Sequence, residues 1–402
     1  MNILQISASY KPAYIYGGPI FSVAKLCEGL VAADEDVEVL TTTANGKNEL
    51  PVRPGDLQVV DAVPVKYFTR ITKDHTHLSP NLLRHLYKRL SDLQSNKINT
   101  VVHIHAWWNL VSVMACMIVK FKNYPVVLSP RGTLSSYSFG NRNSGIKGLV
   151  HRFLSKRLLK YCHFHVTSEI EKQGVLELIT PKSVTIIPNF LYLPNINLSR
   201  LAHIRKDPAH FKLLFLSRIE EKKGVDILIN ALSILLTETL PNSVTELKNL
   251  KHVTLTIAGT GNPAYINKLK KMACDLGVSE NIEWIGQQNQ DEKWIVLAKH
   301  DLLVLSSHNE NFANVVVESL AAGTAVVLSK YVGLVDYVEQ NRFGVSCLTT
   351  PESVVAAIVS ASDLSFLEKV RSTAPQKVRE DFSEGKLVPE YQNLYKRVLE
   401  AS

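Results

Sequence analysis

The sequence predicts an α/β protein built from two doubly wound domains. Short apolar, β-rich runs alternate with helical stretches almost throughout the 402 residues. Continuous apolar strands separated by helices indicate parallel sheets that are covered on both faces. A chain of this length is too long for one comfortable core, so two such sheets in series fit it.

Each half of the chain supplies its own set of strand-like runs. The first half contains NILQIS, VEVLTTT, VVHIHA, PVVLSP and HFHVTS, with helical material such as FSVAKLCEGLVAA between them. The second half contains KLLFLSR, VTLTIAGTG, IEWIG, DLLVLSS, AVVLSK and GVSCLT. Prolines and asparagines interrupt the pattern at residues 186–199. We therefore predict a first domain over residues 1–190 and a second over residues 191–385, with the closing helix 386–402 packing back on the first.

The composition excludes several classes of protein. Hydrophobic and charged contents of 46% and 20% are typical of a soluble globular protein. No apolar run approaches the roughly 20 residues of a transmembrane helix, and MNILQISASY lacks the basic start of a signal peptide. The five cysteines are far apart with no C-x-x-C spacing, which predicts reduced thiols and no metal site. These features predict a cytoplasmic protein.

The positive charge lies entirely in the first half of the chain. Residues 1–195 hold 22 Lys and Arg against 13 Asp and Glu, a net charge of +9, whereas the remainder holds 23 against 24, a net charge of −1. Such asymmetry fits a nucleic acid, an anionic membrane or a phosphorylated ligand, and alone it selects none of them.

The stretch ENFANVVVE, residues 310–318, combines two acids with a turn and a helix start. Glu310 follows the predicted strand DLLVLSS, and Glu318 lies about one turn inside the helix, which runs on through SLAAG. The backbone N–H groups from about Asn311 to Val315 are then unpaired donors at the positive end of the helix dipole, which suits a phosphate or sugar hydroxyls. Glu318 can accept from a ribose diol. Alternatively, the two glutamates could have only structural roles, as a surface carboxylate and a helix-capping acid.

Two further loops carry groups that suit an anion. In FLSRIEEKKGVDILINAL, Arg218 ends a strand and Lys223 precedes a helix, so the two cations can clamp a diphosphate and neutralise a leaving group. In YGGPIFSVAKL, Gly17 and Gly18 permit close backbone approach at the start of the first helix. Taken singly, these could be a solvated pair of cations and an ordinary tight turn.

Together these motifs resemble a known family. Gly-Gly after the first strand, Arg-x4-Lys, IAGTG, IPN at the linker and Glu-x7-Glu occur in the order found in the retaining glycosyltransferases of family four, which have the GT-B fold and include bacterial mannosyltransferases and sucrose synthase. The closing segments GLVDYVEQNRFGV and YQNLYKRVLEA are similar to the C-terminal region of that family. The resemblance covers nearly the whole chain and implies two Rossmann-like domains that face a cleft.

The resemblance also implies a role for each motif. Arg218 and Lys223 would bind the diphosphate of a UDP- or GDP-sugar, Glu310 would hold the donor sugar, and Glu318 would hold the ribose. It further implies retention of anomeric configuration, no cofactor and no required metal, because two side-chain cations replace Mg²⁺. The remaining residues expected to contact the donor are Gly17, Gly18, Gly286, Gln287, Asn311, Phe312, Ala313, Asn314 and Val315.

The chain departs from the family at two places. The family often reads Glu-Gly-Phe-Gly where this sequence reads Glu-Asn-Phe-Ala, which leaves the identity of the donor sugar open. In SPRGTL, Arg131 stands where many members have a histidine, and an arginine cannot serve as a base at neutral pH. Arg131 could instead bind an anionic acceptor or a sugar hydroxyl.

The run HIHAWWN ends another strand of the first domain. His103 and His105 share a face of an extended chain, but no third ligand stands nearby, so a metal pair is not favoured. We expect His105, Trp107 and Trp108 to line the acceptor side with Arg131, with core packing as an alternative for either indole.

The sequence therefore predicts a metal-independent, retaining hexosyltransferase that extends a cell-surface polysaccharide or a lipid-linked glycan. Its partners would be a nucleotide sugar and an oligosaccharide or lipid-linked acceptor, with no nucleic acid. The basic, helix-like residues 145–161 would rest on the anionic cytoplasmic face of the inner membrane, or would form a half-buried helix with a solvated basic face. The alternatives are a sugar-nucleotide epimerase of the same fold and a degenerate binding subunit.

Overall fold

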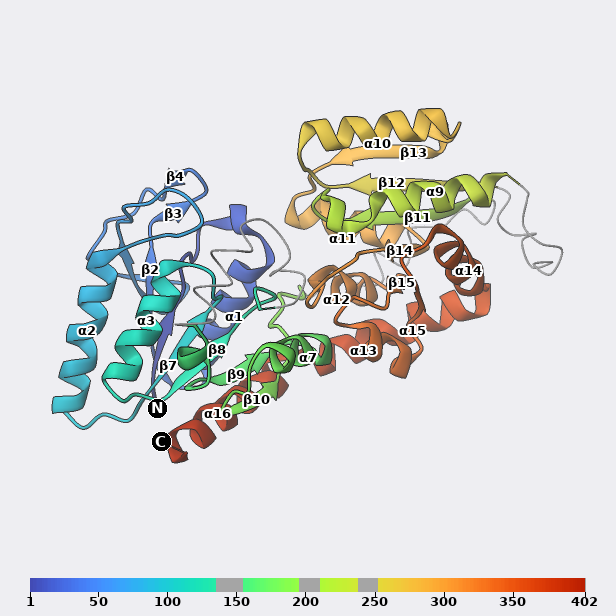
Figure 1. Cartoon of the computed structure of the whole chain (residues 1–402). Helices are drawn as coiled ribbons and strands as arrows, with labels where there is room; N and C mark the ends of the chain where they lie inside the picture. The colour runs from blue at the N-terminus through green and yellow to red at the C-terminus, as the bar shows by residue number, and fades with distance from the viewer. Residues whose placement is uncertain (135–154, 195–209, 238–251, 402) are drawn as a thin grey trace. The chain divides into compact units, whose positions relative to one another are not determined.

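The computed structural model describes residues 1–134, 155–194, 210–237 and 252–401 (Figure 1). The chain divides into two compact units. Unit 1 comprises Met1–Tyr192 with Phe382–Ser402, and unit 2 comprises Leu193–Asp381. The predicted boundary at residues 190 and 191 lies two residues before this division, and the chain returns to unit 1 four residues before the predicted start of the closing helix.

Unit 1 is built on an eight-stranded sheet in the order β10-β9-β8-β7-β1-β2-β6-β5, parallel except for β5. The sheet strands are β1 (Asn2–Ile6), β2 (Asp36–Thr42), β5 (Leu57–Val60), β6 (Val63–Phe68), β7 (Thr100–His105), β8 (Val126–Ser129), β9 (His163–Val166) and β10 (Ser183–Ile186), and β3 (Ala44–Asn45) pairs with β4 (Asn48–Glu49) apart from them. The helices are η1 (Tyr14–Tyr16), α1 (Gly18–Ala32), α2 (Pro80–Ser95), α3 (Leu110–Phe121), α6 (Lys156–Leu159), α7 (Glu169–Leu178) and α16 (Glu384–Glu400).

Two apolar layers bury the sheet of unit 1. One face packs against α2, α3, α6 and α7, and the other packs against α1 and α16. The central strands β1, β7, β8 and β9 are buried at every position, as expected for parallel strands covered on both sides. The helix α16 is therefore part of this core although it lies at the end of the chain (Figure 1).

Unit 2 is built on a six-stranded parallel sheet in the order β13-β12-β11-β14-β15-β16. Helix α9 packs against α14 and α10, while α12 packs against α15 and α11. The strands are β11 (Phe211–Leu216), β12 (Val253–Ala258), β13 (Ile282–Gly286), β14 (Leu302–Leu305), β15 (Ala325–Ser329) and β16 (Gly344–Cys347). The helices are η3 (Glu221–Lys223), α9 (Val225–Leu236), α10 (Pro263–Asp275), η5 (Ser279–Asn281), α11 (Gln290–Lys299), α12 (Asn314–Ala321), α13 (Val335–Asn341), α14 (Pro351–Ala361) and α15 (Leu364–Asp381).

The predicted α/β class with two parallel sheets is confirmed, and each of the eleven predicted runs forms a strand. The sequence did not predict the short pair β3 and β4, nor β5, β6 and β10. In the described residues, no helix has both the length and the apolarity needed to cross a bilayer.

Candidate active site

The loop after β14 holds Glu310 in a fixed backbone position. The Glu310 N–H donates to the carbonyl of Tyr331 at 3.0 Å, and the N–H of Gly333 donates to the carbonyl of Glu310 at 2.9 Å. Ala313 then adopts a left-handed conformation, with φ of 64°, and α12 begins at Asn314. This bridge holds the chain between strand and helix, and it presents the Glu310 side chain, which is only 22% exposed, beside the loop that follows β11.

The valine run of α12 is explained by burial. Val316 and Val317 are completely buried, and Val315 is half-buried. Burial of these side chains outweighs their weak preference for a helix, so tertiary packing overrides propensity. Glu318 lies on the same short helix, where its side chain is 14% exposed.

Lys223 points from the loop after β11 directly to Glu310. Its ammonium group forms an ion pair with Glu310 Oε2, although the two residues are 87 positions apart in the sequence. Lys223 is only 6% exposed. Burial lowers the pKa of Lys223 to about 7, and the nearby charges of Lys222 and Arg218 act in the same direction. The carboxylate at its ammonium group acts the opposite way, because an opposite charge favours the charged amine.

Glycines allow the loops of this site to approach each other. Gly224, next to Lys223, has φ of +65°, and a Cβ there would lie 2.3 Å from the carbonyl oxygen of Ser306. In the IAGTG motif, a Cβ on Gly259 would lie 1.8 Å from the carbonyl oxygen of Ser217. A side chain at either position would force the loops after β11, β12 and β14 apart.

Arg218 remains accessible beside the buried lysine. Its side chain is 69% exposed, and its guanidinium forms an ion pair with Glu220 at 3.1 Å. Glu220 also contacts the ammonium group of Lys222 at 3.4 Å. A surface ion pair of this kind is weak, so Arg218 can exchange Glu220 for an incoming anion at little cost.

Glu318 has a partner that the sequence reading missed. Lys293 on α11 donates to Glu318 Oε1 at 2.7 Å, and both side chains are more than four-fifths buried. No spacing rule reveals this pair, because the two residues lie on different helices 25 positions apart. Gly286 and Gln287, two of the residues expected to contact the donor, are exposed at the end of β13.

These loops meet at one edge of the unit 2 sheet. The strands β12, β11 and β14 are neighbours, and Gly259, the Arg218–Lys223 loop and Glu310 follow their carboxyl ends. Ligands of open α/β sheets bind at that edge. The Lys223–Glu310 contact thus joins two of the three predicted catalytic residues, and it leaves Arg218 open to solvent nearby.

In unit 1, Gly17 and Gly18 stand where the sequence predicts. Gly17 has φ of 71° and precedes α1, which begins at Gly18 and has a proline in its first turn. Both follow the carboxyl end of β1, the ligand-binding edge of this sheet.

The expectation that Trp107 and His105 line an acceptor surface is wrong for this structure. Trp107 is 0% exposed and belongs to the core, and His105 is 2% exposed. Ala106 has φ of 62°, which turns the chain at the end of β7. Trp108 stays half-buried, with its indole N–H donating to the carbonyl of Thr133 at 2.7 Å.

Arg131 is held by unit 1 itself. One terminal nitrogen donates to Ser22 Oγ and to Asn189 Oδ1, both at 3.0 Å, and Nε donates to His105 Nδ1 at 3.3 Å. These bonds turn the guanidinium inward, which does not favour the predicted contact with an acceptor. Burial lowers the pKa of His105 well below its usual value, so a neutral imidazole faces the arginine.

A metal site on the histidines of β7 has no support. His103 bonds to the Tyr395 hydroxyl at 2.8 Å and to Ser129 Oγ at 2.6 Å, and His105 bonds to Gln5 at 2.7 Å. Among the residues that the structure describes, no three His, Cys, Asp or Glu side chains gather as metal ligands would.

One Asp-x-Asp triplet occurs in the sequence, at residues 34–36, and the structure uses it locally. Glu35 accepts from the Met1 amino group and from Gln392, while Asp36 accepts from Asn2. The triplet leads into β2 at the amino end of that strand, away from the carboxyl edge.

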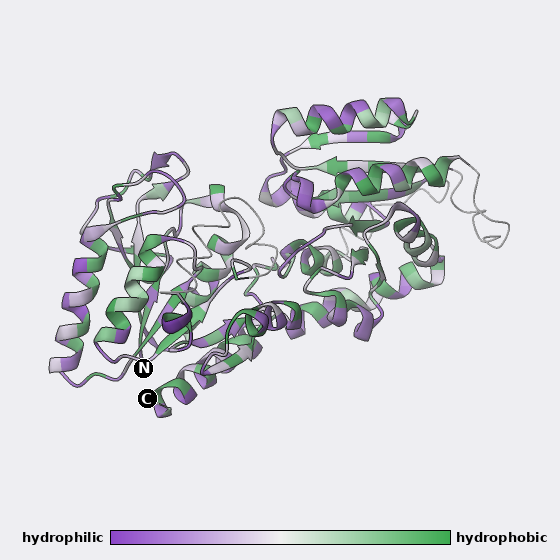
Figure 2. Cartoon of the chain, in the orientation of Figure 1, coloured by the Kyte–Doolittle hydropathy of each residue, from purple (hydrophilic) through white to green (hydrophobic). Residues whose placement is uncertain are grey.

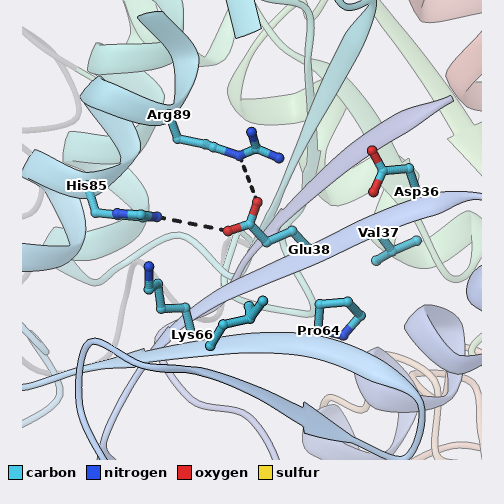
Figure 3. A pocket seen from close by; sticks show the side chains of 8 residues that line it. Asp36, Val37, Glu38, Pro64, Lys66, His85 and Arg89 are labelled. Carbon is cyan, nitrogen blue, oxygen red and sulfur yellow. Dashed lines mark hydrogen bonds and ion pairs between the residues drawn. The ribbon is translucent and has the colours of Figure 1, made fainter. Parts of the chain in front are cut away.

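A hollow of about 410 Å³ lies at the same amino end of β2. Figure 3 shows Glu38 in its wall, bonded to Arg89 Nε at 2.8 Å and facing His85 Nε2 at 3.9 Å. Because parallel sheets bind ligands at the carboxyl edge, we do not assign this hollow to the candidate site.

Two family models together match most of the chain. Residues 16–193 match the model of the family described as Glycosyltransferase Family 4, and residues 202–377 match the model described as Glycosyl transferases group 1. A glycogen synthase of Mycobacterium tuberculosis is 28% identical over 402 aligned residues, which cover 95% of this chain and 91% of that protein.

Solved structures share the fold across the full chain. Sucrose-phosphate synthase from Thermosynechococcus elongatus has a TM-score of 0.71 at 16% identity, and each chain is covered completely. Anabaena HepE in complex with UDP-glucose has a TM-score of 0.68 at 17% identity, again with complete coverage of both chains. The fold and the two family matches define a glycosyltransferase of the GT-B class. The two family matches lie one in each unit, and the chain belongs to family four of that class.

Proposed function

We propose that unit 2 binds a nucleoside-diphosphate sugar and that the enzyme transfers the sugar with retention of configuration. The observation that carries this proposal is the buried Lys223–Glu310 ion pair beside the exposed Arg218, at the carboxyl edge of the sheet. A diphosphate needs fixed cations, and a sugar needs a fixed hydrogen-bond acceptor. The three side chains supply both in one place.

The proposed chemistry is electrostatic. As the bond between the anomeric carbon and the diphosphate oxygen breaks, negative charge grows on the leaving diphosphate. Lys223 and Arg218 stabilise that charge, and Glu310 accepts hydrogen bonds from the sugar hydroxyls. A diphosphate next to Lys223 also favours its charged form, opposing the effect of burial on its pKa. The acceptor hydroxyl attacks from the face that the diphosphate leaves.

Glu318 is the proposed ribose ligand. Its Oε1 accepts from Lys293, while a carboxylate can accept several hydrogen bonds, so the diol of a ribose can be accommodated. Gly286 and Gln287 are exposed where a base would be read. The likeness to a protein crystallised with UDP-glucose supports a UDP-sugar over a GDP-sugar.

The acceptor is proposed to be a glycan, free or lipid-linked, in the assembly of a cell-surface polysaccharide on the cytoplasmic side of the membrane. Similarity to a glycogen synthase supports a saccharide acceptor. Of the basic segment 145–161 that we expected to contact the membrane, residues 145–154 lie outside the described residues. Within its remainder, Lys156, Arg157 and Lys160 are exposed.

A panel of UDP- and GDP-sugars tests this proposal. We expect the wild-type chain to bind one donor and to hydrolyse it slowly without acceptor, with the released sugar keeping its anomeric configuration by NMR. Because Lys223 and Arg218 supply the positive charge, turnover should survive EDTA. Loss of turnover with EDTA, restored by Mn²⁺, would contradict metal independence.

The same panel separates the alternatives. An epimerase would convert the donor into an epimeric nucleotide sugar, and a degenerate subunit would bind without turnover. Either result would overturn the proposed transfer reaction.

A further inference from the structure

Helix α3 carries an apolar stripe on its exposed side. Leu110, Met114, Met117 and Phe121 are 38%, 38%, 42% and 73% exposed. At 3.6 residues per turn, these four positions fall within about 60° of one another around the helix axis. They therefore form one continuous row along the helix, which we call the α3 stripe.

The opposite side of α3 is apolar as well. Val111, Val113, Ala115, Cys116 and Val119 are buried against the sheet and its neighbouring helices. A helix that is apolar all round is normally buried on every side or placed against lipid. In Figure 2, α3 is largely green along its length, whereas α2 beside it carries purple segments.

Positive charge flanks the end of the stripe on both sides. Lys122 lies 4.0 Å from the centre of the Tyr87 ring on α2, and Tyr87 is 43% exposed. On the other side, Lys120 Nζ contacts the Arg157 carbonyl at 3.4 Å. Tyr161, after α6, packs beneath Lys120 and Lys182. Lysines and tyrosines have apolar bodies with polar tips, which suits the boundary between lipid headgroups and acyl chains.

The charge of the surrounding sequence has one sign. Residues 80–134 and 155–168 contain ten Lys and Arg and a single acidic residue, Asp92. Arg131 is turned inward and Arg89 pairs with Glu38, and the other eight cations leave the sequence around Met117 and Phe121 with a net positive charge. The α3 stripe and its flanking lysines match an anionic bilayer. The apolar side chains would insert at the boundary of the acyl chains, and the lysines would contact the lipid phosphates.

We propose that the α3 stripe, with Lys120 and Lys122 at its end, docks unit 1 on an anionic phospholipid membrane. The inference is independent of the donor chemistry in unit 2, because no residue of the stripe belongs to that site. Docking is reversible, since one short helix face and a few lysines give weak binding that salt can reverse.

Vesicle co-sedimentation of the full chain tests the proposal. The vesicles contain phosphatidylcholine with phosphatidylglycerol, or phosphatidylcholine alone, at low and high salt. We expect binding to the anionic vesicles at low salt and at least about tenfold weaker binding at high salt or on the neutral vesicles. Absence of binding to anionic vesicles at low salt would overturn the proposal.

Two variants locate the surface. Met117→Gln with Phe121→Gln should weaken binding at least about tenfold by removing the apolar contact. Lys120→Gln with Lys122→Gln should weaken it by about fivefold for each lysine removed. Two double variants serve as matched controls and should bind like the wild type. Lys268→Gln with Lys369→Gln, both in unit 2, is the control for the lysines. Ile71→Gln with Leu364→Gln, at exposed apolar residues outside the α3 stripe, is the control for the apolar pair. Donor hydrolysis should be unchanged in all four, which separates docking from the proposed function.

A direct readout covers the case in which a variant folds poorly. The Phe121→Trp protein should show blue-shifted indole emission with anionic vesicles, and lipids brominated on the acyl chains should quench it. An unshifted, unquenched indole overturns the proposal. The proposal is also overturned if the wild type binds no vesicles but self-associates, and if Met117→Gln with Phe121→Gln abolishes that self-association. A second copy of the chain would then be the partner.

Discussion

At the scale of single residues, the donor site depends on one buried ion pair. Lys223 would be an expensive charge to bury alone, because burial, together with the nearby charges of Lys222 and Arg218, lowers its pKa to about 7. Glu310 stabilises the ammonium group, and the backbone bridge to Tyr331 and Gly333 holds Glu310 in place. The chain thereby keeps a cation ready at the sheet edge without a bound ligand.

Glu318→Gln tests the proposed ribose contact. The amide keeps the shape of the side chain but loses the charge that strengthens its hydrogen bonds, and it leaves Lys293 without its ionic partner. We expect KM for the donor to rise by about tenfold or more, with kcat little changed. Steady-state kinetics measures this. Glu283→Gln, at an exposed position of β13, is the control and should behave as wild type. An unchanged KM would remove Glu318 from the donor site.

At the scale of elements, the site depends on how closely three loops approach. Gly224 and Gly259 lie where any Cβ would overlap a neighbouring carbonyl oxygen. The loops after β11, β12 and β14 can therefore meet only because these positions lack side chains. That contact, rather than the regular strands, places Lys223 against Glu310.

Gly224→Ala should destabilise unit 2 by more than about 3 kcal/mol, because strain at a left-handed φ adds to overlap with Ser306. Gly277→Ala is a matched control with φ of +72° and no atom within 4 Å of its Cβ, so it should cost only roughly 1 kcal/mol. Urea unfolding measures both. Equal losses of stability in the two variants would show that the close approach of Gly224 to Ser306 does not contribute to the effect.

The sequence predicts elements better than it predicts side-chain directions. Most of the eleven predicted runs form strands that are buried on both faces, and such burial leaves a continuous apolar signal in the sequence. The runs that form β13 and β16 are more exposed. The hairpin β5–β6 was missed because β5 is largely exposed at the sheet edge and Pro64 interrupts β6. Trp107 was misplaced because Ala106, a residue with no preference for positive φ, turns the chain there. The Lys293–Glu318 pair depends on the packing of two helices, which spacing within one segment cannot show.

At the scale of the whole molecule, the closing helix completes the core of unit 1. Tyr395 bonds to His103, and Tyr391 bonds to His165 at 3.0 Å. Ser129 Oγ links the two histidines at 2.6 Å to each. Burial lowers the pKa of His103 well below its usual value and that of His165 to about 3. This network requires neutral imidazoles, so protonation of the histidines would remove these hydrogen bonds between the sheet and α16.

Stability should therefore fall on acidification. Below about pH 6.5 a histidine of the unfolded chain binds a proton, whereas His165 of the folded chain binds one only near pH 3. The free energy of unfolding therefore falls by up to about 1.4 kcal/mol per pH unit for each such histidine as the pH is lowered. Unfolding midpoints measured between pH 7.5 and 5 check this. His165→Gln should reduce the pH dependence of stability by the contribution of about one bound proton. A midpoint that is flat across this range would contradict the neutral network.

Two adjacent lysines of one loop give the sharpest test of the proposed diphosphate site. Lys223 is buried against Glu310, whereas the Lys222 side chain is 35% exposed and pairs with Glu220. Donor turnover is measured for Lys223→Met and Lys222→Met, with circular dichroism as the check on folding. We expect a loss of about 10²-fold for Lys223→Met, the scale of removing one preorganised charge, and near-normal turnover for Lys222→Met. A folded Lys223→Met enzyme with near-normal turnover would contradict the proposed diphosphate site.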